Sequence, residues 1–287
     1  MATKAFAKPI SKPTPKKPST ELANWDEELA AQAAQAAEVE ASTATGQMFS
    51  TKSGQLSFND APLDNNQMAV VVADAILENV YYGSDYDADN PKGPLCWAFG
   101  RDEDNLAPHE VAVKAGTSQA KTCAECEHNV FGSADKGKGK ACRNIRRLAL
   151  IPAGSLDKHG AFEPFETAEE FETSAIGFLK LPVTSVKGYS AFVKTTAGAL
   201  RRPLHGIFTK IKVVPDAKSQ FKVVFEVLAK VPNEVMRSVM ERHNEAKVLI
   251  DFSYSSPSDE ETTAKPVGRG KTAAKPTANP APGRRKF

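Results

Sequence analysis

The stretch "QMAVVVADAILENVYYG" at residues 67–83 decides the fold, because regular structure begins here. Its alanines leave a helix open as an alternative. The adjacent Val70, Val71 and Val72 favour an extended chain, since β-branched side chains suit a pleated sheet. Two tyrosines and a glycine end the run, which is typical of a strand that leads into a turn. The sequence therefore predicts a β-strand over residues 68–82.

Apolar runs after this strand extend the pattern towards the C-terminus. The predicted elements are strands at residues 94–100, 146–152 and 175–182, a helix over 183–200, a hairpin of strands at 205–214 and 221–231, and a helix over 233–247. A helix between a group of strands and a closing hairpin matches an OB-like barrel of five strands. We therefore expect a mainly β fold with helices, an OB-like barrel, with a mixed α+β sheet as the alternative.

The ends of the chain differ in composition from its middle. Of the 287 residues, 41% are hydrophobic, which is enough to bury the core of one domain, expected at residues 66–252. Residues 1–65 read as a disordered, lysine- and proline-rich basic arm, an alanine-rich helix and a linker. Residues 253–287 read as a disordered, mainly basic tail with a short acidic patch.

No apolar stretch resembles a secretory signal, and no run of about 18 apolar residues could span a bilayer. We therefore expect a protein of the cytoplasm, or of the host cell cytoplasm if it is viral, with no membrane partner. In a reducing compartment, cysteines seldom form structural disulfides. This raises the expectation of a metal site in a chain that has four cysteines.

All four cysteines fall between residues 96 and 142. Cys123 and Cys126 form a CxxC pair, which can offer two thiolates to one tetrahedral ion, and Cys142 and Cys96 supply the third and fourth. The spacing predicts a closed structural Zn²⁺ site in a metal loop at 96–142, with an iron–sulfur cluster as the alternative. The neighbouring His128 and His109 are alternative fourth ligands in place of Cys96.

Basic residues crowd the end of this loop and are interleaved with glycine, which lets backbone amides approach phosphate. The cations of the loop are Lys136, Lys138, Lys140, Arg143, Arg146 and Arg147. On the predicted hairpin, alternation places Phe208, Lys210 and Lys212 on one outer face. The remaining candidate contacts are Lys194, Arg201, Arg202, Trp97 and Tyr82. Cations for phosphate and rings for bases are what binding of single-stranded nucleic acid requires.

Motifs of common enzyme classes are missing from the sequence. It has no GxxxxGK[ST] phosphate loop, no HExxH pair and no HxE ahead of the CxxC, as a zinc deaminase needs. We therefore do not expect an enzyme.

The segment "CAECEHNVFGSADKGKGKACRNIRRLALIP" at residues 123–152, the barrel-like strand order and the basic-aromatic faces together resemble the single-stranded-DNA-binding proteins of tailed bacteriophages. The resemblance covers roughly residues 66–252 and is one of architecture and motif type. It implies an OB fold with an inserted zinc module that binds single-stranded DNA without sequence preference during phage replication or recombination. Replication or recombination proteins would be partners through the tails.

Two features depart from that family. Its metal-bearing members include a histidine ligand, whereas four cysteines are present here, and its common acidic tail is replaced by a mainly basic one. The alternative function is therefore a zinc-bearing interaction or regulatory factor that docks on a host polymerase or nuclease.

Overall fold

The computed structural model describes residues 28–29, 32, 47–83 and 92–254. The chain divides into two compact units where the sequence predicts one domain. Unit 1 contains Met1–Ile76 and Ile145–Ile250, and unit 2 contains Leu77–Asn144 and Asp251–Phe287. The predicted basic arm, the C-terminal tail from residue 255 and most of the alanine-rich helix lie outside the described residues, although Glu28, Leu29 and Gln32 are helical.

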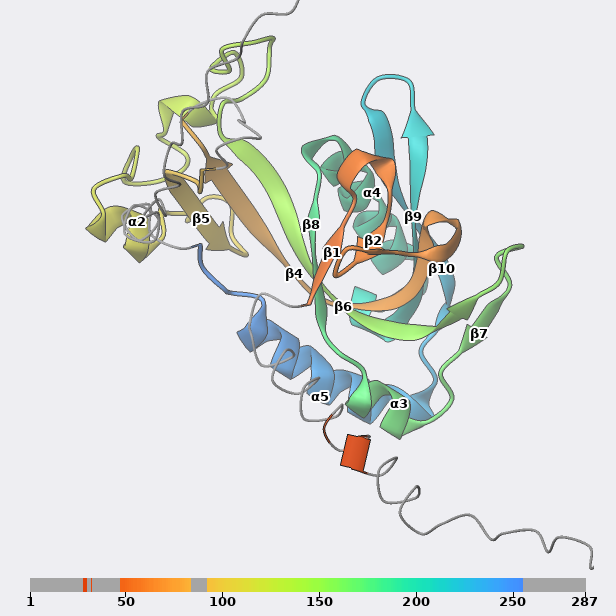
Figure 1. The fold of residues 1–287 in the computed structure, drawn as a ribbon. Helices are drawn as coiled ribbons and strands as arrows, with labels where there is room; N and C mark the ends of the chain where they lie inside the picture. Colours follow the sequence, from red (N-terminus) through yellow and green to blue (C-terminus); the bar gives the residue numbers. More distant parts are fainter. Residues whose placement is uncertain (1–27, 30–31, 33–46, 84–91, 255–287) are drawn as a thin grey trace, which may run out of the picture. The chain divides into compact units, whose positions relative to one another are not determined.

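Unit 1 combines a mixed β-sheet with helices (Figure 1). Its strands are β1 (Met48–Ser50), β2 (Ser57–Phe58), β3 (Ala61–Pro62), the first part of β4 (Gln67–Tyr81), most of β6 (Arg143–Leu156), β7 (Phe162–Pro164), β8 (Gly177–Leu181), β9 (Ile207–Asp216) and β10 (Gln220–Lys230). Its helices are α3 (Ala168–Thr173), α4 (Val183–Leu200) and α5 (Asn233–Leu249), with 3-10 turns η1 (Lys52–Gly54), η2 (Asp64–Asn66) and η4 (Leu204–Gly206).

The strand order is β10-β9-β4-β6-β8-β1-β2-β3, with β7 paired to β6. Strands β1 and β8 run parallel, and the β9–β10, β4–β9 and β6–β8 pairs are antiparallel. Within the described residues the two end strands, β10 and β3, do not pair with each other, so the sheet is open. The protein is thus mostly β with some helices in a mixed sheet, and the closure that an OB-like barrel requires is not formed by these strands.

Strand β4 is buried along nearly its whole length, which explains its composition. Its residues 67–73 are all buried, and β9 and β6 flank the strand in the sheet. A strand covered on both faces reads as a continuous apolar run rather than an alternating one. The core of unit 1 comprises Phe49, Leu56, Met68, Val70, Val72, Leu148, Leu150, Leu179, Leu181, Tyr189, Ile211, Val213 and Val223.

The predicted elements from residue 67 onwards are confirmed with shifted ends, whereas two predicted connectors are wrong. The expected linker to residue 65 contains β1, β2 and β3, and its Phe49 and Leu56 lie in the core. The segment between the strands predicted at 146–152 and 175–182, which reads as a polar, acidic connector, contains β7 and α3, and β6 runs on to Leu156. Strands of two or three residues are too short to show a periodicity, so the sequence did not reveal them.

The predicted outer face of β9 is partly wrong. Phe208 is 1% exposed, because its ring packs against Phe162 of β7 at 5.4 Å and against Phe171 of α3 at 6.2 Å between centroids. Lys210 is half-buried and forms an ion pair with Glu226 on the adjacent strand. Phe208 is therefore a core residue and offers no ring to a base.

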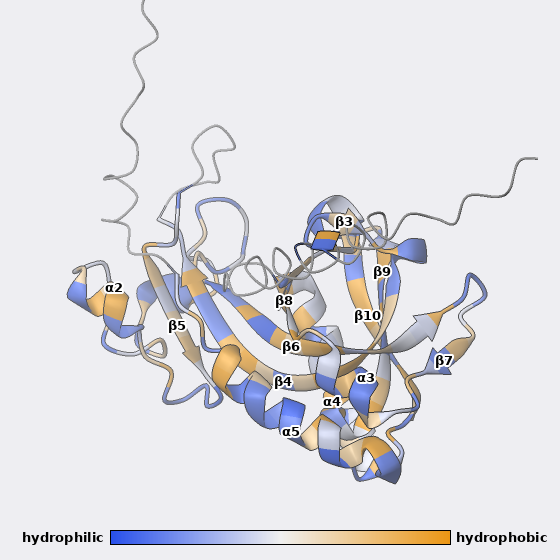
Figure 2. Ribbon diagram, turned by 60° about the horizontal axis from the view of Figure 1, so that its bottom comes forward, coloured by the Kyte–Doolittle hydropathy of each residue, from blue (hydrophilic) through white to orange (hydrophobic). Residues whose placement is uncertain are grey.

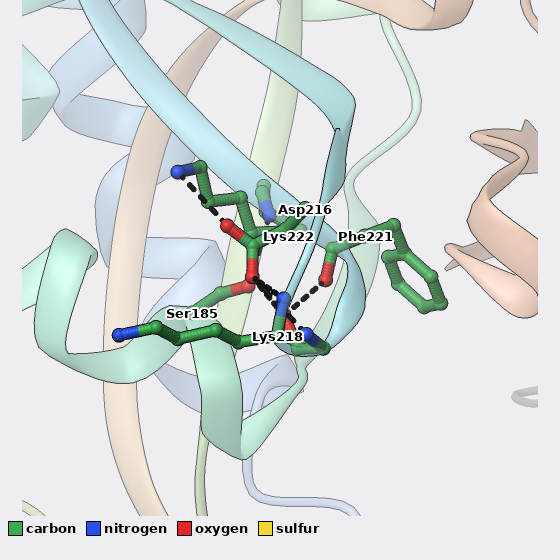
Figure 3. Close-up of polar contacts among 7 residues, drawn as sticks. Ser185, Asp216, Lys218, Phe221 and Lys222 are labelled. Carbon is green, nitrogen blue, oxygen red and sulfur yellow. Dashed lines mark hydrogen bonds and ion pairs between the residues drawn. The ribbon is translucent and has the colours of Figure 1, made fainter.

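The turn between β9 and β10 is held by one carboxylate, that of Asp216 (Figure 3). It accepts hydrogen bonds from the backbone N–H groups of Lys218 and Ser219 at 3.2 and 3.1 Å. The Ser219 hydroxyl donates at 2.9 Å, and Lys222 Nζ lies 3.2 Å away. Together, the Ser219 hydrogen bond and Lys222 lower the pKa of Asp216 to about 2, so the turn keeps its anion at neutral pH.

Helix α4 packs on the edge strand β10. The Ser185 hydroxyl is buried there and accepts a hydrogen bond from the Val223 backbone N–H at 2.9 Å. An edge strand exposes amides that could pair with another chain. Ser185 therefore satisfies one edge amide with a side chain of the same unit.

Helix α5 has an apolar and a polar face, and Figure 2 shows both hydrophobic and hydrophilic colouring along it. It packs against α3. The fully buried Arg147 of β6 donates from Nη1 to the backbone carbonyl of Ile250, just after α5, at 2.9 Å. His243 of α5 hydrogen-bonds through Nδ1 to the Ala73 carbonyl of β4. Polar contacts therefore fix the position of α5 within unit 1. None of the helices in the described parts of the chain combines the length and the apolar character needed to cross a membrane.

Replacing Ser185 tests the protection of the β10 edge. Because Ser185→Ala leaves the buried Val223 amide without its acceptor, we expect the free energy of unfolding to fall by about 1 to 3 kcal/mol. Thr195→Ala, at an exposed position of the same helix, is the matched control and should change stability little. Urea denaturation measures both, and equal stability of the two variants would contradict the assignment.

Candidate nucleic-acid interface

Unit 2 is built around the end of β4 and contains few regular elements. Strand β5 (Cys96–Gly100) pairs antiparallel with residues 77–81 of β4. Helix α2 (Glu110–Lys114) and the 3-10 turn η3 (Glu127–Asn129) follow, and the first residues of β6 complete the unit. Its small apolar cluster contains Ala98, Leu106 and Cys123, with Leu77 packed against it.

The four cysteines come together, but not as a metal centre. All four line one pocket of about 20 Å³, and all four are free thiols. Among the residues that the structure describes, no three His, Cys, Asp or Glu side chains are grouped so that they could hold a metal ion. The prediction of a Zn²⁺ site at Cys96, Cys123, Cys126 and Cys142, with an iron–sulfur cluster as the alternative, is therefore wrong for these residues.

Burial gives these thiols a different character. Cys123, Cys126 and Cys142 are 7–8% exposed, and Cys96 is half-buried. Desolvation raises the pKa of Cys96 and of Cys123 above the ordinary 9.0, and it raises the pKa of Cys142 to about 12, with a further rise from the neighbouring thiols. A metal ligand has to be a thiolate, and the raised pKa values of Cys96, Cys123 and Cys142 disfavour that form. Buried thiols of this kind pack as small apolar groups.

An aromatic cluster anchors the residues that follow α5 to unit 2. Trp97 is 1% exposed, and its Nε1 donates to Ser253 Oγ at 3.2 Å. The Tyr254 ring lies 5.5 Å from that of Trp97, and its hydroxyl donates to the buried Glu78. Trp97 is therefore part of the packing rather than the stacking platform that the sequence predicts.

The glycine-lysine loop is closed by its own hydrogen bonds. The Gly132 and Ala134 backbone N–H groups donate to the Gly139 carbonyl at 2.8 and 3.3 Å. The Ser133 hydroxyl donates to the carbonyls of His128 and Val130 and accepts from the Ala141 N–H at 3.0 Å. At the base of the loop, the Cys142 N–H donates to the His128 carbonyl at 2.8 Å. These hydrogen bonds, rather than a bound metal ion, close the loop.

Beside this loop lies a polar hollow of about 240 Å³, formed entirely by unit 2. The end of β4, turn η3, the loop and the start of β6 contribute to it. Its lining residues are Tyr81, Tyr82, Gly83, His128, Ser133, Ala134, Asp135, Lys136, Lys140, Ala141 and Arg143. Three cations and one carboxylate thus share a small volume with two tyrosines and a histidine.

Two ring contacts order the walls of this hollow. Arg143 Cζ lies 5.3 Å from the centroid of the Tyr82 ring, within the range of a cation–π contact. The Tyr81 and His128 rings stack with centroids 4.1 Å apart and planes within 10°. The wall residues are therefore held in place by one another.

A further aromatic ring lies at the start of the glycine-lysine loop. Phe131 is 78% exposed, and Lys140 Nζ lies 5.3 Å from its centroid. Lys140 Nζ also donates to Asn129 Oδ1 at 3.1 Å, which fixes the cation between the ring and the hollow that it lines. An aromatic side chain exposed to this extent contributes little to packing and is available to a partner.

Burial and a hydrogen bond set the position of Tyr82. Its pKa is raised, chiefly by desolvation, while Arg143 lowers it, Glu78 raises it and a side-chain hydrogen bond with Tyr254 lowers it. The hydroxyl is thus tied to Tyr254, and the phenol stays neutral over the physiological pH range.

The structure separates the predicted nucleic-acid contacts into three groups. Tyr82, Lys136, Lys140 and Arg143 meet at the hollow, and Lys138 is exposed in the same loop. The second group is buried and comprises Trp97, Phe208 and Arg147. The remaining candidates belong to unit 1, namely Arg146, Lys194, Arg201, Arg202, Lys210 and Lys212.

Two unit 1 arginines have structural roles that the sequence does not indicate. Arg202 donates from Nη1 to the Val231 carbonyl at 2.9 Å, and Arg201 ends α4 in a left-handed conformation at φ 51°.

The sequence did not point to Ser133 or Asp135, and it offered His128 as an alternative metal ligand or as a surface, hydrogen-bonding residue. A signal was present, because a pair of tyrosines ends the central strand and a serine opens the glycine-lysine run. The tyrosines and the loop residues come together only because the loop folds back onto η3. Residue spacing in the sequence does not show this. No protein-family model, no curated protein and no solved structure matches the chain.

Alkylation kinetics test the state of the thiols. Because the pKa of Cys142 is raised to about 12, iodoacetamide should react slowly with it near the ordinary thiol pKa of 9.0, and the rate should keep rising at higher pH without a plateau there. Peptide mapping by mass spectrometry follows each cysteine, with the urea-unfolded chain as the reference. A native rate equal to the unfolded rate would show that Cys142 is neither buried nor shifted.

Proposed function

We propose that this protein binds single-stranded DNA, as its resemblance to the phage family implies, and that it does so through the hollow and the loop beside it. We also propose that it is not an enzyme. The observation that carries the proposal is the meeting of Lys136, Lys140 and Arg143 with Tyr82 in one hollow, next to the exposed ring of Phe131. Cations neutralise phosphates along the strand. Rings stack on bases, at about 1 to 3 kcal/mol for each base.

The arrangement favours single strands over duplexes. In a duplex the faces of the bases are already stacked, so an exposed ring gains no base to stack on. A single strand offers both free base faces and a flexible backbone that can follow the charged loop. The contacts are with phosphates and ring faces, which every nucleotide has, so we expect little sequence preference.

Several finer points remain predictions. A closed OB-like barrel is not required, since the hollow belongs to unit 2 and the open sheet to unit 1. Action in the cytoplasm, during replication or recombination, and partner proteins that bind the tails follow from the sequence and the resemblance. Docking on a host polymerase or nuclease is the competing function, and the titration below separates the two.

Neutralising the hollow tests the proposal. In the triple variant Lys136→Ala, Lys140→Ala and Arg143→Ala, affinity for a fluorescent oligo-dT should fall, and the slope of log affinity against log salt should flatten by about 2, because three phosphate contacts are lost. Fluorescence anisotropy at about 50 and 200 mM salt measures both quantities, with duplex DNA of the same length as the comparison.

A variant with the same change of net charge serves as the control. Lys158→Ala, Lys187→Ala and Lys230→Ala remove three exposed cations of unit 1 and should leave the slope almost unchanged. If the two triple variants lose affinity equally, only the net charge matters and the hollow is not the interface. If the wild-type chain binds neither oligo-dT nor duplex, the proposal fails and a protein-docking function is favoured.

A further inference from the structure

The size and lining of the hollow limit what it can accept. Its volume of about 240 Å³ is below the range of about 300 to 1,000 Å³ that is typical of sites for drug-sized ligands. It is closed on one side by the loop, whose Gly132, Ala134 and Ala141 amides are engaged within the loop. A length of several nucleotides therefore cannot enter it, whereas one unit of a strand can.

The lining supplies partners for both parts of a nucleotide. Lys136, Lys140 and Arg143 are donors for phosphate oxygens, and the planar Arg143 guanidinium matches them with paired N–H groups. The same guanidinium lies over the Tyr82 ring, 5.3 Å from its centroid. Bases that are splayed out of a strand stack on aromatic rings and on arginine planes, so this pair offers a platform for one base.

The site is preorganised. The Tyr82 hydroxyl is held by Tyr254, the Tyr81 ring by His128, and the Lys140 ammonium by Asn129 and Phe131. Side chains that are already fixed lose little conformational entropy when a ligand binds. The entropic cost of binding a single nucleotide is therefore low.

From these observations we infer that the hollow is a subsite for one unstacked nucleotide, with its base on the Tyr82–Arg143 pair and its phosphate on the lysines, while Phe131 contacts a neighbouring nucleotide outside the hollow. The inference rests on the proposed function and specifies that the hollow binds one nucleotide of the strand. A site for phosphate alone would bind inorganic phosphate as well as a nucleotide, and a ring surface alone would bind a nucleoside as well as a nucleotide. A subsite that contacts both the base and the phosphate prefers the nucleotide to either part.

Saturation-transfer NMR on the full chain tests the subsite with dTMP, thymidine and inorganic phosphate as probes. We expect transfer to the thymine methyl and H6 protons of dTMP, weaker transfer to thymidine, which lacks the phosphate, and loss of the dTMP signal when phosphate is added in excess. Equal signals from dTMP and thymidine that phosphate does not diminish would overturn the phosphate half of the inference.

Two matched ring deletions locate the site. Tyr82→Leu should abolish the dTMP signal. Phe131→Leu, outside the hollow, should retain it, because the Asn129 hydrogen bond still holds Lys140, and should weaken only oligo-dT binding. Arg143→Gln changes an exposed side chain and provides a second loss of signal if Tyr82→Leu fails to fold. Equal dTMP signals from the wild type and from Tyr82→Leu or Arg143→Gln would overturn the site.

The two proposals fail in different ways. Absence of any dTMP signal from a wild-type chain that still binds oligo-dT overturns the subsite and leaves single-strand binding intact. Absence of oligo-dT binding overturns both.

Discussion

The burial of strand β4 is the constraint on which the rest of the structure depends. Its residues 67–73 lie within the sheet, where backbone N–H and C=O groups have to pair with neighbouring strands. Such pairing fixes the register, because a shift of one residue would turn every side chain to the opposite face. The last residues of the same strand pair with β5 in unit 2, so that the strand ends in Tyr81 and leads directly to Tyr82 at the hollow.

Unit 2 has little regular structure, and side-chain contacts take the place of a large core. Four free thiols line one small pocket, the Ser133 hydroxyl and the Gly139 carbonyl close the loop, and Tyr254 ties the chain after α5 to Glu78. These contacts order the cations and rings that surround the hollow. Positioned charges lose less entropy on binding than charges on a mobile chain, which is why the order of this loop matters for function.

Much of the fold could be predicted from residue 67 onwards, because β4 is a β-branched apolar run and α4, the β9–β10 hairpin and α5 have clear periodicities. The short strands β1–β3 could not, since two or three residues show no pattern. Alternation correctly placed Lys210 and Lys212 together, but it could not show that β7 and α3 cover Phe208. Arg147 reads as a surface cation until its partner at Ile250, far along the chain, is known.

The candidate site, like the fold, was only partly predictable from the sequence. The clustering of cysteines and of cations is visible in the sequence, and both clusters do come together in space. Composition could not reveal that burial raises the pKa of Cys142, because desolvation depends on the packing around the thiol. Nor could it reveal that a hollow forms between the tyrosines and the loop.

Photochemical crosslinking of oligo-dT to the full chain, followed by mapping of the modified peptides, tests the central claim most directly. Ultraviolet light joins thymine to side chains in contact with it, so the products report the path of the strand. We predict crosslinks to Tyr82 and Phe131 and none to the exposed residues of β9 and β10. Crosslinks confined to β9 and β10, with none in unit 2, would contradict the account.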